Sequence, residues 1–167
     1  MKLGFITSIC EGMSFEEVVD FAAENHLECL EVACWPQGGA SRRYAGVSHI
    51  DVAGLNQEKA KYINEYCKER GVEISSLAYY PNTLEPDQEK REAYIAHLYK
   101  LIDASAMLDV NMVTTFIGRD PQKTVTENLE IVKAVWPPIV KYAEEKGVKI
   151  AIENCPMLFT EDEWPGG

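Results

Sequence analysis

The feature that most limits the possible folds is a short junction that recurs along the chain. Each copy lies where a helical pattern ends and a strand pattern begins, and successive copies are roughly 40 residues apart, the length of one β/α unit. The copies are Asn25-His26-Leu27, Arg70-Gly71-Val72, Leu108-Asp109-Val110 and Lys146-Gly147-Val148. Strict alternation of helix and strand in this way favours a parallel sheet.

The segments between these junctions predict strands and helices in turn. Short apolar, β-branched runs predict strands at 3–7, 29–34, 72–78, 111–117 and from 148 to 153. Capping residues followed by apolar side chains at helical spacing predict helices at 14–25, 56–70, 86–108 and 124–146. Pro137 and Pro138 should break or kink the last helix, because neither has a backbone N–H to donate. The irregular segment 37–54 is long enough to suggest a functional or mobile loop.

Charge and cysteine content narrow the classes of partner. The 167 residues carry a net charge of −11, which argues against a nucleic-acid backbone or an anionic membrane surface as partner. No apolar run approaches the ~20 residues of a membrane span, and Met1-Lys2-Leu3-Gly4 leads directly into a strand pattern, so we expect neither a membrane span nor a signal peptide. The five cysteines include no Cys-x-x-Cys pair, so we expect free thiols in a reducing cytoplasm.

Glu153 is the best single candidate for chemistry. It follows the last predicted strand, and sites in parallel α/β folds are built at the carboxyl ends of strands. The simpler alternative is a carboxylate that pairs with a neighbouring Lys or Arg. Asn154 comes next and could orient Glu153, contact a substrate or cap the loop.

Four other side chains are candidates for contacts with a substrate. Trp35 ends the second predicted strand, where an aromatic ring could form a pocket wall or pack in the core. Tyr79 and Tyr80 end the third strand, and alternation sends one of them inward and the other toward the helices. His49 lies in the long loop, either at the surface or in contact with a substrate or phosphate.

Three segments resemble the sugar phosphate isomerase/epimerase family of the xylose isomerase-like TIM barrel superfamily. They are Leu3-Gly4-Phe5-Ile6-Thr7, Leu30-Glu31-Val32-Ala33-Cys34-Trp35-Pro36 and, above all, Ile150-Ala151-Ile152-Glu153-Asn154. The resemblance implies a (β/α)₈ barrel of about 250 residues or more, of which this chain supplies about five strands and four helices. We therefore expect one domain over residues 1–167, the N-terminal part of a barrel truncated after its fifth strand.

The resemblance also implies a reaction. Members of the family hold a divalent ion (Mn²⁺, Mg²⁺, Co²⁺ or Zn²⁺) with two Glu, an Asp and a His, and move a proton next to the carbonyl of a sugar or sugar phosphate through an enediolate. Glu153 matches the first of those glutamates, which is both metal ligand and acid/base. The other ligands come from later strands, so this chain alone is expected to bind the metal poorly and to be inactive.

Three alternatives remain open. A dehydratase or aldolase of the same superfamily would use the same enediolate. An apurinic endonuclease is disfavoured, since it needs histidines at the ends of strands three and four, where the chain has Ala78-Tyr79-Tyr80 and Thr115-Phe116-Ile117. The third is an inactive binding or assembly fragment, whose open sheet would expose two edges and favour a homo-oligomer.

Overall fold

The predicted alternation of strands and helices is confirmed by the structure, a computed structural model that describes residues 1–37 and 46–153. Its elements follow in this order: β1 (Gly4–Ile6), a 3₁₀ turn η1 (Thr7–Ile9), α1 (Phe15–Glu24), β2 (Cys29–Ala33), α2 (Gln57–Arg70), β3 (Glu73–Ala78), α3 (Gln88–Met107), β4 (Met112–Thr115), α4 (Val125–Glu145) and β5 (Lys149–Ile152). Most strands are one to three residues shorter than the sequence predicts.

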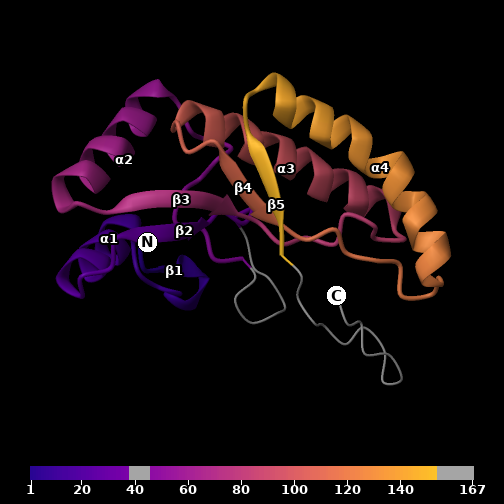
Figure 1. Ribbon diagram of the computed structural model, residues 1–167, viewed down its shortest axis with the longest axis horizontal. Coiled ribbons are helices and arrows are strands. Elements are labelled where there is room, and N and C mark those ends of the chain that lie inside the picture. The colour runs from indigo at the N-terminus through magenta and orange to yellow at the C-terminus, as the bar shows by residue number, and fades with distance from the viewer. Residues whose placement is uncertain (38–45, 154–167) are drawn as a thin grey trace.

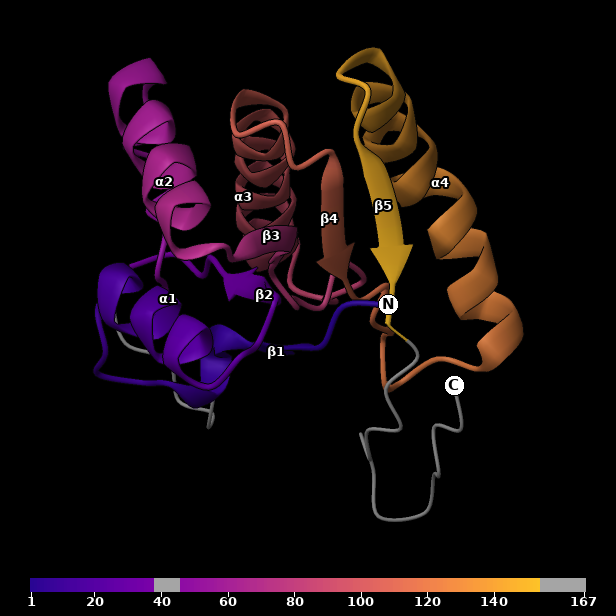
Figure 2. The same cartoon turned by 60° about the vertical axis from the view of Figure 1, so that its left-hand side comes forward.

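The five strands form one parallel sheet in sequence order, β1-β2-β3-β4-β5. Figure 1 shows the helices arranged around the outside of this curved sheet, and in Figure 2 β4 and β5 run side by side in the same direction. Neighbouring parallel strands joined by right-handed crossovers place every helix on the same face. The result is a partial (β/α)₈ barrel, with β1 and β5 at the two edges of the described sheet.

The hydrophobic core lies between the sheet and the helices. Leu30 and Val32 of β2, Leu77 of β3 and Val113 of β4 are completely buried on the helix side. Alternate residues of a strand point to opposite faces, so Glu31, between Leu30 and Val32, points to the inner face of the barrel. The buried apolar residues thereby fix which side chains can line the site.

The recurring junctions have a common conformation. His26, Gly71, Asp109 and Gly147 all have positive φ, at 58°, 68°, 56° and 70°. A left-handed residue after a helix lets the next amides bond back to the last carbonyls. Val72, for example, donates its N–H to the carbonyl oxygen of Cys67 at 3.1 Å. The repeated junction in the sequence is thus a repeated helix end.

The predicted break at Pro137-Pro138 is wrong, because α4 continues through both prolines. Both rings are exposed, so water can reach the carbonyl groups that lose a partner. Trp136 and Ile139 beside them are buried, and a capping box at Thr124 fixes the start of the helix. Packing and capping therefore outweigh the two missing hydrogen bonds.

No helix among the described residues is long and apolar enough to cross a bilayer.

Candidate functional site

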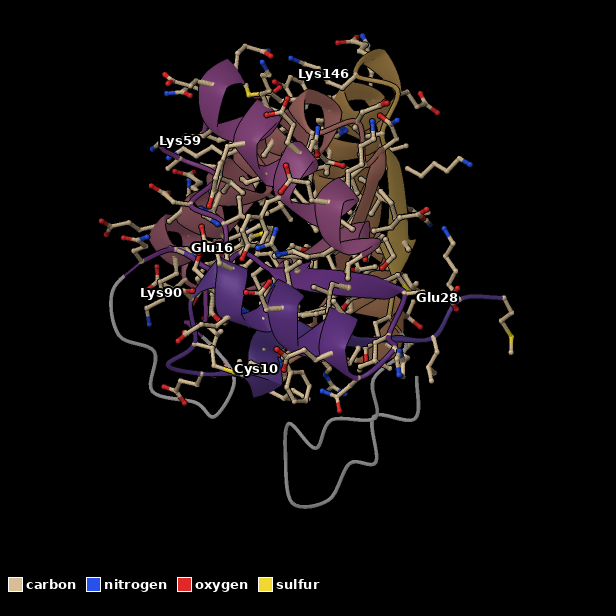
Figure 3. All side chains as sticks on the ribbon, turned by 90° about the vertical axis from the view of Figure 1, so that its left-hand side faces the viewer. Cys10, Glu16, Glu28, Lys59, Lys90 and Lys146 are labelled. Atoms are coloured by element: carbon tan, nitrogen blue, oxygen red, sulfur yellow. The ribbon has the colours of Figure 1, made fainter. Side chains whose placement is uncertain are left out.

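The candidate site lies at the carboxyl-terminal ends of the strands. In Figure 3, Glu16, Lys59 and Lys90, near the starts of α1, α2 and α3, lie toward one side of the molecule, and Glu28, just before β2, lies toward the other. Each helix begins where the preceding strand ends, so the side that carries Glu16, Lys59 and Lys90 is the side of the carboxyl-terminal strand ends. Sites of β/α barrels are built on this side.

Glu31 and Tyr80 form the centre of a polar cluster on the inner face. The Tyr80 hydroxyl donates a hydrogen bond to Oε1 of Glu31, and the Ser76 hydroxyl donates to Oε2 at 3.1 Å. Thr114 Oγ1 of β4 lies 3.5 Å from Ser76 Oγ. Burial, and next the hydrogen bond to Glu31, raise the pKa of Tyr80 well above its usual range. The ring of Phe116 packs against the Tyr80 ring at 4.5 Å between centroids.

A β-bulge decides which tyrosine faces inward. Leu30 pairs with Ile74, but Glu31 pairs with Ser76, so Ser75 is an extra residue in β3. The Ser75 hydroxyl donates to the carbonyl oxygen of Leu30 at 3.0 Å. One extra residue moves every later side chain to the other face. Tyr80 therefore points inward to Glu31.

Tyr79 faces the helices. It is 1% exposed and packs edge-on against Trp35 at 4.9 Å and against His97 of α3 at 4.7 Å between ring centroids. His97 Nε2–H donates to the carbonyl oxygen of Cys34 at 2.8 Å. The expected division of the two tyrosines is thus observed, and Trp35, which is half-buried, covers Tyr79 at the end of β2.

Glu153 follows β5 directly. Its backbone N–H donates to the carbonyl oxygen of Thr115 at 3.0 Å, and Ala151, two residues earlier, pairs with the inward-facing Thr114. Glu153 therefore belongs to the inner face, and its charge is one of the causes that raise the pKa of Tyr80. Its side chain is exposed. Within the described part of the chain it forms no ion pair with a Lys or Arg.

His49 contacts the end of β1. Its Nδ1 lies 2.9 Å from the Thr7 hydroxyl, which also accepts a hydrogen bond from the Ala33 N–H at 2.9 Å. Burial lowers the pKa of the imidazole. His49 also lines an open groove of about 290 Å³ between the starts of α1 and α2, together with Glu16 and Lys59. Asn154, the other predicted contact, lies outside the described residues.

Sequence reasoning missed Glu31, Ser76 and Thr114. Glu31 carried a usable signal, since it is a charged residue between two apolar ones in a strand pattern. Ser76 carried none, because its inward position depends on the bulge at Ser75. These residues, with Tyr80 and Glu153, form the inward polar row of β2 to β5.

The described residues provide only part of a binding site for a divalent ion. Among residues 1–37 and 46–153, no group of three or more His, Cys, Asp or Glu side chains comes together. Four-ligand sites need more donors than this part of the chain provides. Glu153, an exposed carboxylate at a strand end, has the oxygen donors that such an ion accepts.

The parallel β/α units and the polar row at their strand ends define a β/α-barrel protein. The family model described as xylose isomerase-like TIM barrel matches residues 19–164. The chain therefore belongs to the xylose isomerase-like TIM barrel family, as the sequence resemblance implied. A search of curated proteins found no match.

Solved structures share the fold at low identity. A D-tagatose 3-epimerase-like protein is 22% identical, with a TM-score of 0.68 over 95% of this chain and 55% of that one. The probable 3-DHS dehydratase AsbF from Bacillus anthracis is 20% identical, with a TM-score of 0.66 over 92% and 52%. The IOLI protein with a bound zinc atom is 18% identical, with a TM-score of 0.63 over 91% and 51%. The chain thus spans about half the length of the structures it matches.

Proposed function

We propose that the protein is a metal-dependent isomerase or epimerase of a sugar or sugar phosphate. The observation that carries this proposal is Glu153, a carboxylate at the end of β5 that faces the same side as Tyr80 and Glu31. Family membership supports it, because the matched structures include a D-tagatose 3-epimerase-like protein. The substrate would therefore be a small ketose.

Glu153 has two roles in this proposal. Its carboxylate would remove a proton from the carbon next to the substrate carbonyl and return it. It would also be one ligand of a divalent ion (Mn²⁺, Mg²⁺, Co²⁺ or Zn²⁺), whose positive charge would stabilise the enediolate. A zinc atom in a matched structure supports a metal. The remaining ligands would come from parts of the whole protein that the described residues do not include.

Substitution of Glu153 tests this assignment. In the intact protein, Glu153→Gln should lower proton exchange next to the carbonyl by about 10²-fold or more. The melting temperature should stay close to that of the wild type, because the side chain is exposed and only the backbone completes the sheet. Deuterium incorporation from D₂O into D-tagatose, D-fructose and their phosphates measures the exchange and identifies the sugar.

A control is Glu145→Gln, which removes another exposed carboxylate, at the end of α4, where it lies 3.9 Å from Lys141. It should leave exchange unchanged. A Glu153→Gln protein that keeps more than a few per cent of the wild-type rate would reject the role of Glu153.

A dehydratase or aldolase is the second candidate, and the match to a probable dehydratase favours it. Both would keep Glu153 and the enediolate, and would differ in the product. Mass spectrometry separates them, since an epimer keeps the mass of the substrate, a dehydratase product has lost water, and an aldolase product is a fragment.

We also propose a cytoplasmic homo-oligomer. The described cysteines, Cys10, Cys29, Cys34 and Cys67, are free thiols, which suits a reducing compartment. Leu3 before β1 and Ile152 of β5 expose 67% and 43% of their surface at the two sheet edges. Apolar, unpaired edges favour association of this 167-residue chain, and native mass spectrometry of the chain would measure its oligomeric state.

A further inference from the structure

The proton transfer assigned to Glu153 leaves a second set of inward groups unused. Glu31, Ser76, Tyr80 and Thr114 are connected across β2, β3 and β4. All four are buried or half-buried. Within the described part of the chain, Glu31 has no Lys or Arg partner at ion-pair distance. The hydrogen bonds from Tyr80 and Ser76 hold the Glu31 carboxylate in place.

The direction of these hydrogen bonds follows from the chemistry of the groups. An ionised carboxylate only accepts hydrogen bonds, and a phenol has a single proton to donate. Tyr80 gives that proton to Oε1 of Glu31, and Ser76 gives its own to Oε2. The Tyr80 oxygen is consequently left as an acceptor, and Thr114 Oγ1 lies within reach of Ser76 Oγ at 3.5 Å and of the Leu77 carbonyl oxygen at 3.4 Å.

The position of this acceptor suits contact with a ligand. Tyr80 lies just beyond the end of β3, and Glu153 follows β5 on the same inner face of the sheet. Phe116 packs against the ring and limits its movement. A fixed acceptor on the same face as the proposed acid/base selects for a hydroxyl group on the substrate.

We propose that Tyr80 determines specificity by accepting a hydrogen bond from a hydroxyl group of the sugar, with Glu31 holding the phenol proton away from it. This inference rests on the proposed function, since it concerns the sugar on which Glu153 acts. It assigns Tyr80 to recognition and Glu31 to positioning, and neither residue moves the substrate proton.

The first test compares Tyr80→Phe with Tyr79→Phe in the intact protein. The pair is matched, because each variant removes one phenol oxygen from adjacent residues, and Tyr79 packs on the helix side. The readout is kcat/KM for deuterium exchange with D-tagatose and with its singly deoxygenated analogues. The wild type should prefer D-tagatose over one analogue by about 2- to 12-fold, the range of one neutral hydrogen bond.

Tyr80→Phe should abolish that one preference and leave the others unchanged, and Tyr79→Phe should keep all of them. A structural role would instead lower the rates for all sugars in the same ratio. If Tyr80→Phe exchanges D-tagatose and every analogue in the wild-type ratios, the proposal is overturned. If the wild type exchanges none of the sugars, the proposed function fails, and the second measurement decides the state of Tyr80.

The second measurement needs no substrate. In protein labelled with ¹³C at the tyrosine ζ position, the Tyr80 signal is identified by its loss in Tyr80→Phe. It should titrate above the ordinary tyrosine pKa of about 10, and at a lower pH in Glu31→Gln, where the carboxylate acceptor is absent. A Tyr80 signal that titrates at the same pH with and without the Glu31 carboxylate would overturn the positioning role of Glu31.

Discussion

At the scale of single residues, His97 shows how burial makes stability depend on pH. The imidazole is 8% exposed, packs against Tyr79 and donates to the carbonyl oxygen of Cys34. Burial lowers its pKa below the ordinary value of 6.5, although the Cys34 carbonyl acts in the opposite direction. The unfolded chain therefore binds a proton at a higher pH than the folded protein does.

The stabilising effect of neutral His97 is complete above about pH 6.5 and is lost as the pH falls through the lower folded pKa. His97→Gln keeps a donor for Cys34 but does not titrate. The variant should lose less stability than the wild type between pH 7 and pH 5. Urea unfolding at both pH values measures this difference. Equal losses in the two proteins would contradict the burial argument.

The site residues differ in how far sequence predicts them. Glu153 follows a recognisable strand, so its place at a strand end was predictable. The choice between Tyr79 and Tyr80 was not, because the extra residue Ser75 reverses the alternation along β3. A bulge depends on pairing with the neighbouring strand, so the residue pattern of one strand by itself does not predict it.

At the scale of elements, α4 shows packing overriding local preference. Pro137 and Pro138 are exposed, and each removes one hydrogen bond from the helix. Pro138→Ala should restore a bond to the Ala134 carbonyl without loss of core packing. We expect the free energy of unfolding to rise by about 1–2 kcal/mol, since the restored bond exceeds the entropy that proline removes from the unfolded chain.

Urea denaturation of Pro138→Ala and wild type measures this change. Ala134→Gly, an exposed change in the same turn, is the control and should lower stability by about 1 kcal/mol. If Pro138→Ala is no more stable than the wild type, the prolines fit α4 without cost and the explanation given for its continuity is wrong.

The sequence predicts helix ends better than strand ends. The four junctions specify helix ends because a left-handed residue is needed there, and Gly71 and Gly147 adopt it readily. His26 and Asp109 occupy the same conformation. Strand limits are less distinct, since they depend on where the neighbouring strand stops pairing.

At the scale of the whole molecule, the sheet order follows the sequence, with β1 and β5 at its edges. This arrangement brings side chains from β2, β3, β4 and β5 to one inner face. The parallel sheet was predictable because each unit repeats the same strand, helix and junction. The matched structures are about twice as long as this chain, so the activity proposed here is that of the whole protein.

In the proposed reaction, a carboxylate at the end of β5 moves a proton with the help of a divalent ion. Deuterium incorporation into the carbon next to the carbonyl of a ketose, measured in the intact protein with Mn²⁺ and again after treatment with EDTA, tests it directly. Exchange should fall to background without the metal and return when Mn²⁺ is restored. Exchange at an unchanged rate after EDTA would contradict it.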